Sequence, residues 1–384
     1  MARTNRRDVV AVGEVQVFHC VNRCVRRAYL CGRDPVSGKD FEVRREWIRG
    51  RLEFLAGVMG VEVLGYCVMS NHVHCILRSR PDVVEAWTAD EVALKWWNLC
   101  PGRRNKDGSP AEPTEFELNS IGNDQSGMKE KRLRLSSVSW FMRFLSERIA
   151  KLANRDDECT GRFWEGRFKA QPLLDEEAIL ACMQYVDLNP IRAAIATSPE
   201  TSDFTSAQDR IADACGECSV GSFHCSENSA EEAPSSGLWA TFSPAAGEKG
   251  QSDDDMDDHV EHGPRAGWLS PIGEPAKRKS VREKVTTRRA SNKGCLPMAL
   301  GDYLQLLDWT GRQILADKRG AMPQHLESMF ERLGISAELW VDCVVNFRRW
   351  FRSSVGRPKS MQSAAESRGH NRAISIRSAR NAFA

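Results

Sequence analysis

Hydrophobic positions in the first 80 residues follow strand-like and helix-like patterns in turn. Residues 15–25 form a run rich in β-branched side chains, which predicts a strand, and residues 61–69 form a second such run. Between them, apolar residues recur at helical spacing from Ile48 to Met59, and Gly60 follows as a helix-ending signal. The pattern therefore predicts strand, helix and strand.

The second strand is followed by a turn and a third strand. Ser70 and Asn71 are turn-forming residues, so the run that begins at His72 should return antiparallel to residues 61–69 as a hairpin. A helical stretch is expected over residues 82–99. Residues 101–127 are polar and punctuated by Gly and Pro, which is typical of an insertion.

A helix, a strand and a further helix are predicted next. Apolar residues from Val138 to Leu152 have the spacing of an amphipathic helix, residues 161–173 are consistent with a fourth strand, and Asp175 opens a helix. The order strand, helix, strand, strand, helix, strand, helix predicts an α+β fold with a ferredoxin-like antiparallel sheet and packed helices. We assign it to residues 10–197.

The remainder of the chain divides by composition. Residues 198–296 have little periodicity and are expected to be a disordered linker, first acidic and then basic. Helical patterning returns in residues 297–356, where three helices around positions 303–314, 326–333 and 340–351 predict a small all-α C-terminal domain. Residues 357–384 are expected to be a mobile basic tail.

The net charge of +2 hides a strong segregation of charge. Residues 201–262 hold 14 acidic and 2 basic side chains, whereas residues 343–384 hold 9 basic and 1 acidic. Such blocks are typical of solvated linkers and of tails that touch polyanions, and composition does not separate a DNA-contacting role from simple solubility.

Composition also indicates where the protein is found. No run of residues is apolar enough to cross a bilayer, and the first residues lack a signal-peptide core, so we expect a soluble, cytoplasmic protein. Several of the 13 cysteines lie inside apolar runs, which does not indicate a disulfide framework. A zinc site at Cys215, Cys218, His224 and Cys225 has the right ligand count, but its second half has the wrong spacing.

The main candidate for chemistry is the pair His72 and His74. Side chains alternate between the faces of a strand, so these two imidazoles should project side by side from one surface, where they could share a metal ion. Such a cation could polarise a phosphate oxygen. The alternative is two ordinary strand histidines, and the spacing alone does not decide between them.

A metal that activates phosphate also needs a nucleophile, for which Tyr185 is the best candidate. It lies on the side of its predicted helix away from the core positions Ile179, Met183 and Val186, and tyrosine is rare in this chain. Tyr185 is therefore expected to do more than fill the core.

Three motifs together resemble the REP-associated tyrosine transposases, a branch of the HUH single-strand transposases. They are Met69-Ser-Asn-His-Val-His74, Gly161-Arg-Phe-Trp-Glu-Gly-Arg-Phe168 and Tyr185-Val-Asp-Leu-Asn-Pro190. The resemblance covers roughly residues 10–200 and, more loosely, 303–356. It implies an HUH transposase (IS200-like) fold and an endonuclease and strand transferase that cleaves and rejoins single-stranded DNA at hairpin-forming repeats.

The resemblance also implies roles for individual residues. His72 and His74 match the metal ligands, Asn189 matches the position of a third ligand, and Tyr185 matches the nucleophile that becomes linked to a 5′ phosphate. Asn189 precedes Pro190, so it could instead cap a new helix. The expected cofactor is a divalent metal, Mg²⁺ or Mn²⁺. Candidate DNA-binding residues are Arg148, Lys151, Arg155, Arg162, Arg167 and Lys169.

Two other functions stay open on the sequence. The first is a protein that binds repeat hairpins without cleaving them. The second is a histidine-triad nucleotide hydrolase, which calls for a further histidine on the same strand face, where position 76 is Ile. The expected partner is hairpin-forming single-stranded DNA, with no membrane, and a monomer is favoured over a dimer.

Overall fold

The computed structural model describes residues 13–25, 30–34, 38–106, 110–218, 265–274, 288–315, 336–369 and 373–383. In this part of the chain, β1 (Val17–Arg23), β2 (Val61–Val68), β3 (His72–Ser79) and β4 (Lys169–Leu173) form one sheet in the order β2-β3-β1-β4. All three strand pairings are antiparallel. The predicted α+β fold with a ferredoxin-like sheet is confirmed, including the hairpin of β2 and β3.

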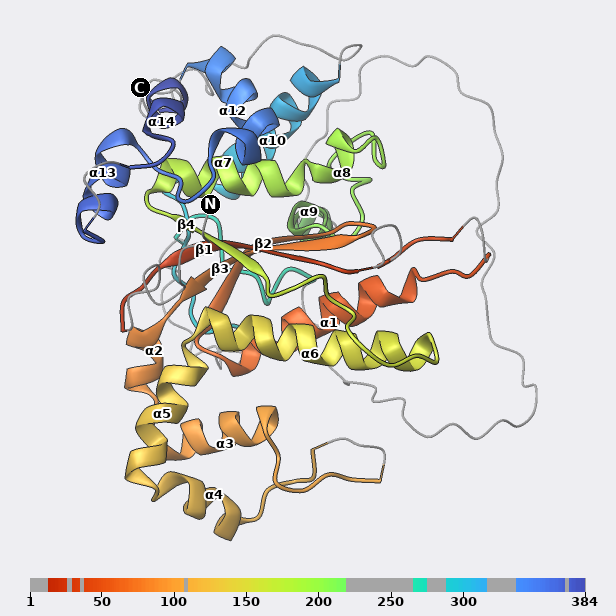
Figure 1. Ribbon diagram of the computed structural model, residues 1–384, viewed down its shortest axis with the longest axis vertical. Coiled ribbons are helices and arrows are strands. Elements are labelled where there is room, and N and C mark those ends of the chain that lie inside the picture. The colour runs from red at the N-terminus through yellow and green to blue at the C-terminus, as the bar shows by residue number, and fades with distance from the viewer. Residues whose placement is uncertain are drawn as a thin grey trace.

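Helices cover both faces of the sheet (Figure 1). One face packs against α1 (Val43–Val58) and α6 (Val138–Asp156), and the other packs against α7 (Glu176–Asp187). The expected start of α7 at Asp175 is confirmed, since the carboxylate of Asp175 accepts a hydrogen bond from the Ala178 backbone N–H at 3.0 Å.

Two predicted segments differ from the structure because of residues that cap helices. The helix expected over residues 82–99 is divided into α2 (Pro81–Ala86) and α3 (Ala89–Leu99) by Thr88, which caps α3. The expected insertion at 101–127 contains α4 (Glu115–Gly122) and the start of α5 (Gln125–Leu135). Its polar residues include Thr114 and Asp124, which cap the starts of α4 and α5. Such residues are common in loops as well, which is why the sequence predicted a loop-like insertion here.

The fourth strand is shorter than residues 161–173. Residues 161–168 make only an isolated bridge between Trp164 and Cys24 before β4 begins. The aromatic side chains of this segment pack into the core beside α6, and the Trp164 indole N–H donates to the Ser146 carbonyl at 2.8 Å. Their burial, and not strand pairing, explains the apolar character of the segment.

The interval expected to be a disordered linker is partly ordered. After the short α8 (Asn189–Arg192), α9 (Ser206–Cys218) packs against β2, and the hydroxyl of Tyr66 donates to Asp209 at 2.7 Å. Trp268 is fully buried. The prediction is wrong for these segments, because their polar residues pair with the sheet instead of with solvent. Residues 219–264 and 275–287 lie outside the described residues.

The C-terminal helices are α10 (Leu300–Ile314), α12 (Ala337–Trp350), α13 (Pro358–Glu366) and α14 (Ile376–Ala382). The helix predicted around 326–333 lies outside the described residues. The expectation of a mobile tail after residue 356 is wrong, since α13 and α14 pack together and Ala379 is fully buried.

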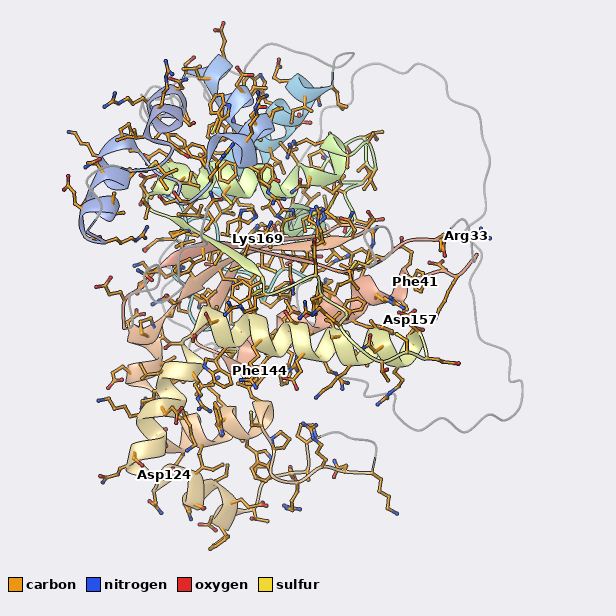
Figure 2. The ribbon with its side chains drawn as sticks, in the orientation of Figure 1. Arg33, Phe41, Asp124, Phe144, Asp157 and Lys169 are labelled. Atoms are coloured by element: carbon orange, nitrogen blue, oxygen red, sulfur yellow. The ribbon has the colours of Figure 1, made fainter. Side chains whose placement is uncertain are left out.

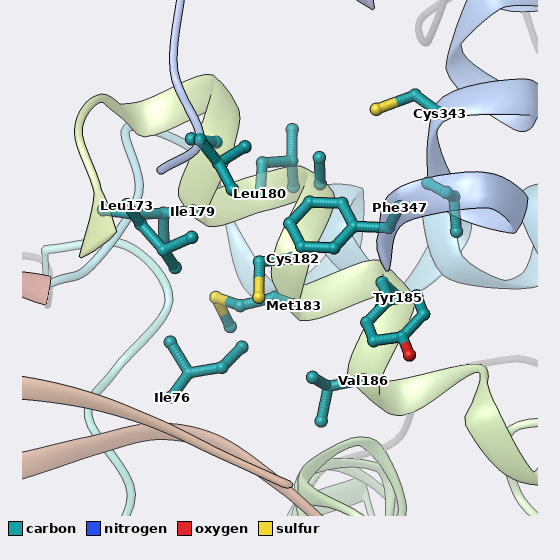
Figure 3. Close-up of a cluster of buried hydrophobic side chains, with 14 of the residues drawn as sticks. Ile76, Leu173, Ile179, Leu180, Cys182, Met183, Tyr185, Val186, Cys343 and Phe347 are labelled. Atoms are coloured by element: carbon teal, nitrogen blue, oxygen red, sulfur yellow. The ribbon is translucent and has the colours of Figure 1, made fainter. Parts of the chain in front are cut away.

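These helices share one hydrophobic core with α7 (Figure 3). Cys343 and Phe347 of α12 pack against α7, and the ring of Phe347 also reaches the sheet, where its centroid lies 6.2 Å from that of His19. The C-terminal region is therefore helical, as predicted, but its described helices close over the second side of α7 and do not form a core of their own. None of the helices in the described ranges has both the length and the apolar character needed to traverse a bilayer.

Candidate active site

The predicted histidine pair lies at the start of β3. The rings of His72 and His74 have centroids 4.7 Å apart and meet edge to face. His72 is partly exposed, whereas His74 is completely buried beneath α7. Strand alternation therefore places both imidazoles on one face of the sheet, as the spacing predicts.

Tyr185 lies against this pair, but it is not on an open surface. Its ring centroid is 5.8 Å from that of His74, and its side chain is only 4% exposed. Phe347 of α12 stacks on the tyrosine ring at 5.1 Å (Figure 3). The expectation that Tyr185 faces away from the core is wrong, because its ring packs against the histidines of the sheet and is also covered by Phe347 of α12.

A third histidine, which the sequence analysis missed, completes the cluster. His19 on β1 is 3% exposed, and its Nε2 lies 2.8 Å from Nδ1 of His74. Its ring is nearly parallel to that of His74, with centroids 5.1 Å apart and an interplanar angle of 11°, and it lies 5.9 Å from the ring of Tyr185. Only the antiparallel pairing of β1 with β3 brings the two histidines together, so no spacing along the chain could have identified His19.

Burial keeps the three imidazoles neutral near pH 7. It lowers the pKa of His19 to about 3 and that of His72 to about 4, and it holds the pKa of His74 well below its usual range. The nearby charge of Arg348 acts in the same direction on all three histidines. Neutral imidazoles are the form that binds metal ions.

The phenol of Tyr185 experiences opposing effects. Burial raises its pKa, while the positive charges of Arg192 and Arg348 oppose this shift. The guanidinium carbon of Arg192 lies 4.7 Å from the centre of the tyrosine ring. Two cations thus lie close to the phenol, and both would favour an anionic group bound there.

The ring nitrogens of the histidine pair suit a divalent cation. Nε2 of His74 is buried and has no hydrogen-bond partner. Nδ1 of His72 contacts Oδ1 of Asn71, which leaves Nε2 as the second nitrogen of that ring. Unused nitrogens on neighbouring rings, each ring held by a hydrogen bond at its other nitrogen, are the usual arrangement of metal-binding histidines. Within the described ranges, however, no group of three or more His, Cys, Asp or Glu side chains is arranged to hold a metal ion.

Asn189 lies one turn after Tyr185 and is buried. Its Oδ1 accepts a hydrogen bond from Arg192 at 3.4 Å, and its Nδ2 has no partner. The side chain does not cap α8, whose cap position is Leu188. The capping explanation for Asn189 is therefore wrong, while its role as a third ligand stays a prediction.

The candidate DNA-binding residues fall into two groups. Arg148, Lys151 and Arg155 lie on α6, in the layer opposite α7 (Figure 1), and Lys151 pairs with Glu147 at 2.9 Å. The second group, Arg162, Arg167 and Lys169, is exposed on β4 and the segment before it, with Lys169 labelled in Figure 2.

The second group lies near the histidine end of the sheet. The backbone N–H of Glu165 donates to the Arg23 carbonyl at 2.8 Å, and Arg23 is paired with His72. Of the two groups, the one around Glu165 thus lies at the same end of the sheet as the histidines.

Comparisons with known proteins yield one structural likeness. No family model matches the sequence, and no curated protein matches it. The fold is similar to the solved structure of a REP-associated tyrosine transposase bound to a REP hairpin, with a TM-score of 0.33 and 10% sequence identity. The match covers 55% of this chain and 86% of that chain. A likeness of this degree assigns neither an activity nor residue roles.

Proposed function

We propose that this protein is a metal-dependent transposase or endonuclease that cleaves and rejoins single-stranded DNA at hairpin-forming repeats through a covalent 5′-phosphotyrosine intermediate. The observation that supports it most directly is the 5.8 Å separation between the rings of Tyr185 and His74, which come from different elements. The three sequence motifs supply the substrate class. Since the phenol and both histidines belong to one chain, we propose that a monomer suffices.

The chemistry follows from the arrangement of the side chains. The phenol of Tyr185 would lose its proton and its oxygen would bond to a backbone phosphorus, while the bond from phosphorus to the 3′ oxygen would break. That oxygen would leave as a 3′ hydroxyl by taking up one proton, so the step neither consumes nor releases protons overall. Attack of a 3′ hydroxyl on the phosphotyrosine reverses the step and rejoins strands without ATP. Arg192 and Arg348, whose charges act on Tyr185, would orient the phosphate.

His72 and His74 would hold a divalent cation, Mg²⁺ or Mn²⁺, with Asn189 as a third ligand. When bound, the cation supplies positive charge beside the non-bridging phosphate oxygens. His72 is the partly exposed member of the pair, so it marks the side from which a phosphate would approach. Phe347 covers the phenol, so part of α12 must shift before DNA reaches Tyr185.

The burial of Tyr185 favours a second candidate, a protein that binds hairpin DNA without cleaving it. A phenol that is 4% exposed and stacked under Phe347 is not accessible to a phosphate in this conformation. The exposed basic residues beside β4 would serve binding in either case.

An adduct assay separates the two candidates. The full chain is incubated with an end-labelled hairpin oligonucleotide and Mn²⁺, and covalent complexes are resolved on a denaturing gel. We expect an adduct that Tyr185→Phe abolishes and Tyr66→Phe retains, since Tyr66 is a buried tyrosine hydrogen-bonded to Asp209, away from the histidines. Peptide mapping should place the nucleotide on Tyr185. Hairpin binding without any adduct would overturn the proposal and support the second candidate.

A further inference from the structure

We propose that His19 is a positioning residue that fixes the tautomer of His74, so that Nε2 of His74 presents a lone pair to a divalent cation. The proposal deepens the proposed function and relies on it for the identity of the bound ion. It assigns a role to a side chain outside the three sequence motifs. The argument starts from the contact between Nε2 of His19 and Nδ1 of His74, which are 2.8 Å apart.

One of these two nitrogens must donate and the other must accept. Both rings are buried, so neither nitrogen can exchange its partner for water. The direction of this hydrogen bond therefore determines which nitrogen of His74 carries its hydrogen.

Gln171 determines the direction. It is directly opposite His19 in the pairing of β1 with β4, so the two side chains lie on the same face of the sheet. The Gln171 amide nitrogen donates to the Phe351 carbonyl at 3.0 Å, which leaves the amide oxygen to accept from His19.

The remaining assignments follow in order. Since Nε2 of His19 faces His74, Nδ1 is the nitrogen that would donate to the free oxygen of Gln171, and Nε2 of His19 would then accept. His74 then carries its hydrogen on Nδ1, and its Nε2 keeps a lone pair that no protein donor meets. A cation bound there would remove the cost of burying an unpaired acceptor.

This series of hydrogen bonds ends at the residue that follows α12. Phe351 follows the last turn of α12, the helix that also places Phe347 on Tyr185. The helix that covers the phenol thus also supplies the carbonyl that orients Gln171.

The first test is the tautomeric state of the histidines in the metal-free full chain. Long-range proton–nitrogen NMR spectra of ¹⁵N-histidine-labelled protein should show His19 and His74 both protonated at Nδ1. A His74 that carries its hydrogen on Nε2 would overturn the proposal without any variant.

The second test is the affinity for Mn²⁺ in the absence of DNA, measured from the electron paramagnetic resonance signal of free Mn²⁺. His19→Phe keeps a ring of similar size but removes the acceptor, and it should weaken binding by about 10- to 100-fold. His19→Gln can place an oxygen near the position of Nε2, so it should stay much closer to the wild type. Gln171→Leu should produce a smaller loss and a mixture of His74 tautomers.

Urea unfolding of each variant shows whether a loss of Mn²⁺ affinity is due to a loss of stability. If His19 had only a structural role, His19→Gln would not be expected to retain Mn²⁺ affinity better than His19→Phe. Wild-type Mn²⁺ affinity in His19→Phe, or a wild-type protein that binds no Mn²⁺, would overturn the inference. A protein whose Mn²⁺ affinity depends on His19 but which forms no DNA adduct would instead refute the proposed function alone.

Discussion

The two faces of the central sheet are both closed by helices, yet they bury different kinds of side chain. The face under α1 and α6 is closed mainly by apolar residues, among which Phe18, Leu52 and Phe141 are at most 1% exposed. The face under α7 also packs against apolar residues, but it additionally buries the imidazoles of His19 and His74. Both faces of the sheet thus have an apolar core, and in the part of the chain that the structure describes one of them also holds buried histidines.

This difference supports the proposal that the α7 face is the functional side. Burying a polar group costs free energy unless the group is hydrogen-bonded, so such groups are seldom kept where apolar ones would do. His74 has one ring nitrogen paired and one unpaired, and burying the unpaired nitrogen costs free energy. A metal ion bound to the unpaired nitrogen would offset this free-energy cost.

The largest expected effect comes from removing one phenylalanine on each face. Phe141→Ala and Phe347→Ala each delete a fully buried ring and should each lower the free energy of unfolding by about 3–5 kcal/mol. Only Phe347→Ala should expose Tyr185, because Phe347 stacks on it. Urea unfolding measures the first effect, and nitration by tetranitromethane with peptide mapping measures the second.

Phe141→Ala is the matched control in this experiment. If Tyr185 is nitrated at the same rate in both folded variants, the view that α12 covers the phenol is contradicted.

A smaller effect is expected from acid. Because burial lowers the pKa of His72 to about 4 and that of His19 to about 3, the unfolded chain takes up protons below about pH 6.5 that the folded chain does not. Stability should therefore fall as pH drops from 6.5 to 4, by at most about 3 kcal/mol for each of these two histidines.

Urea unfolding at a series of pH values checks this expectation. His19→Gln removes one of the titrating groups, so its stability should depend less steeply on pH than that of the wild type. Identical slopes in the two proteins would show that the α7 face does not titrate as a buried cluster.

The smallest effect distinguishes the two groups of basic residues. Arg162→Ala and Arg167→Ala should each weaken hairpin binding by about 1 kcal/mol and reduce the salt dependence by about one phosphate contact. Lys151→Ala and Arg155→Ala, on the layer opposite α7, should change binding less. Fluorescence anisotropy across a salt series measures both quantities, and a larger effect from the α6 pair would place the DNA on the other face.

Local patterns predicted the parts of the molecule that depend on neighbours in sequence. Alternation and turn residues predicted the β2–β3 hairpin with His72 and His74 on one face, and helical spacing predicted α1, α6 and α7. They were less successful for α4 and α9, where polar residues are caps or buried partners of the sheet. A polar segment is predicted to be a loop because its composition does not show which distant residues it will contact.

The sequence by itself determined the alternating register of the histidine strand, the helical period of α7 and the order of elements that produces a ferredoxin-like sheet, because these follow from steric rules acting over a few residues. Only the tertiary structure decided that His19 meets His74, that α12 covers Tyr185 and that the C-terminal helices close over α7. Strand register and helix docking depend on contacts between residues more than 50 positions apart, as with His19 and His74, and no local period encodes them.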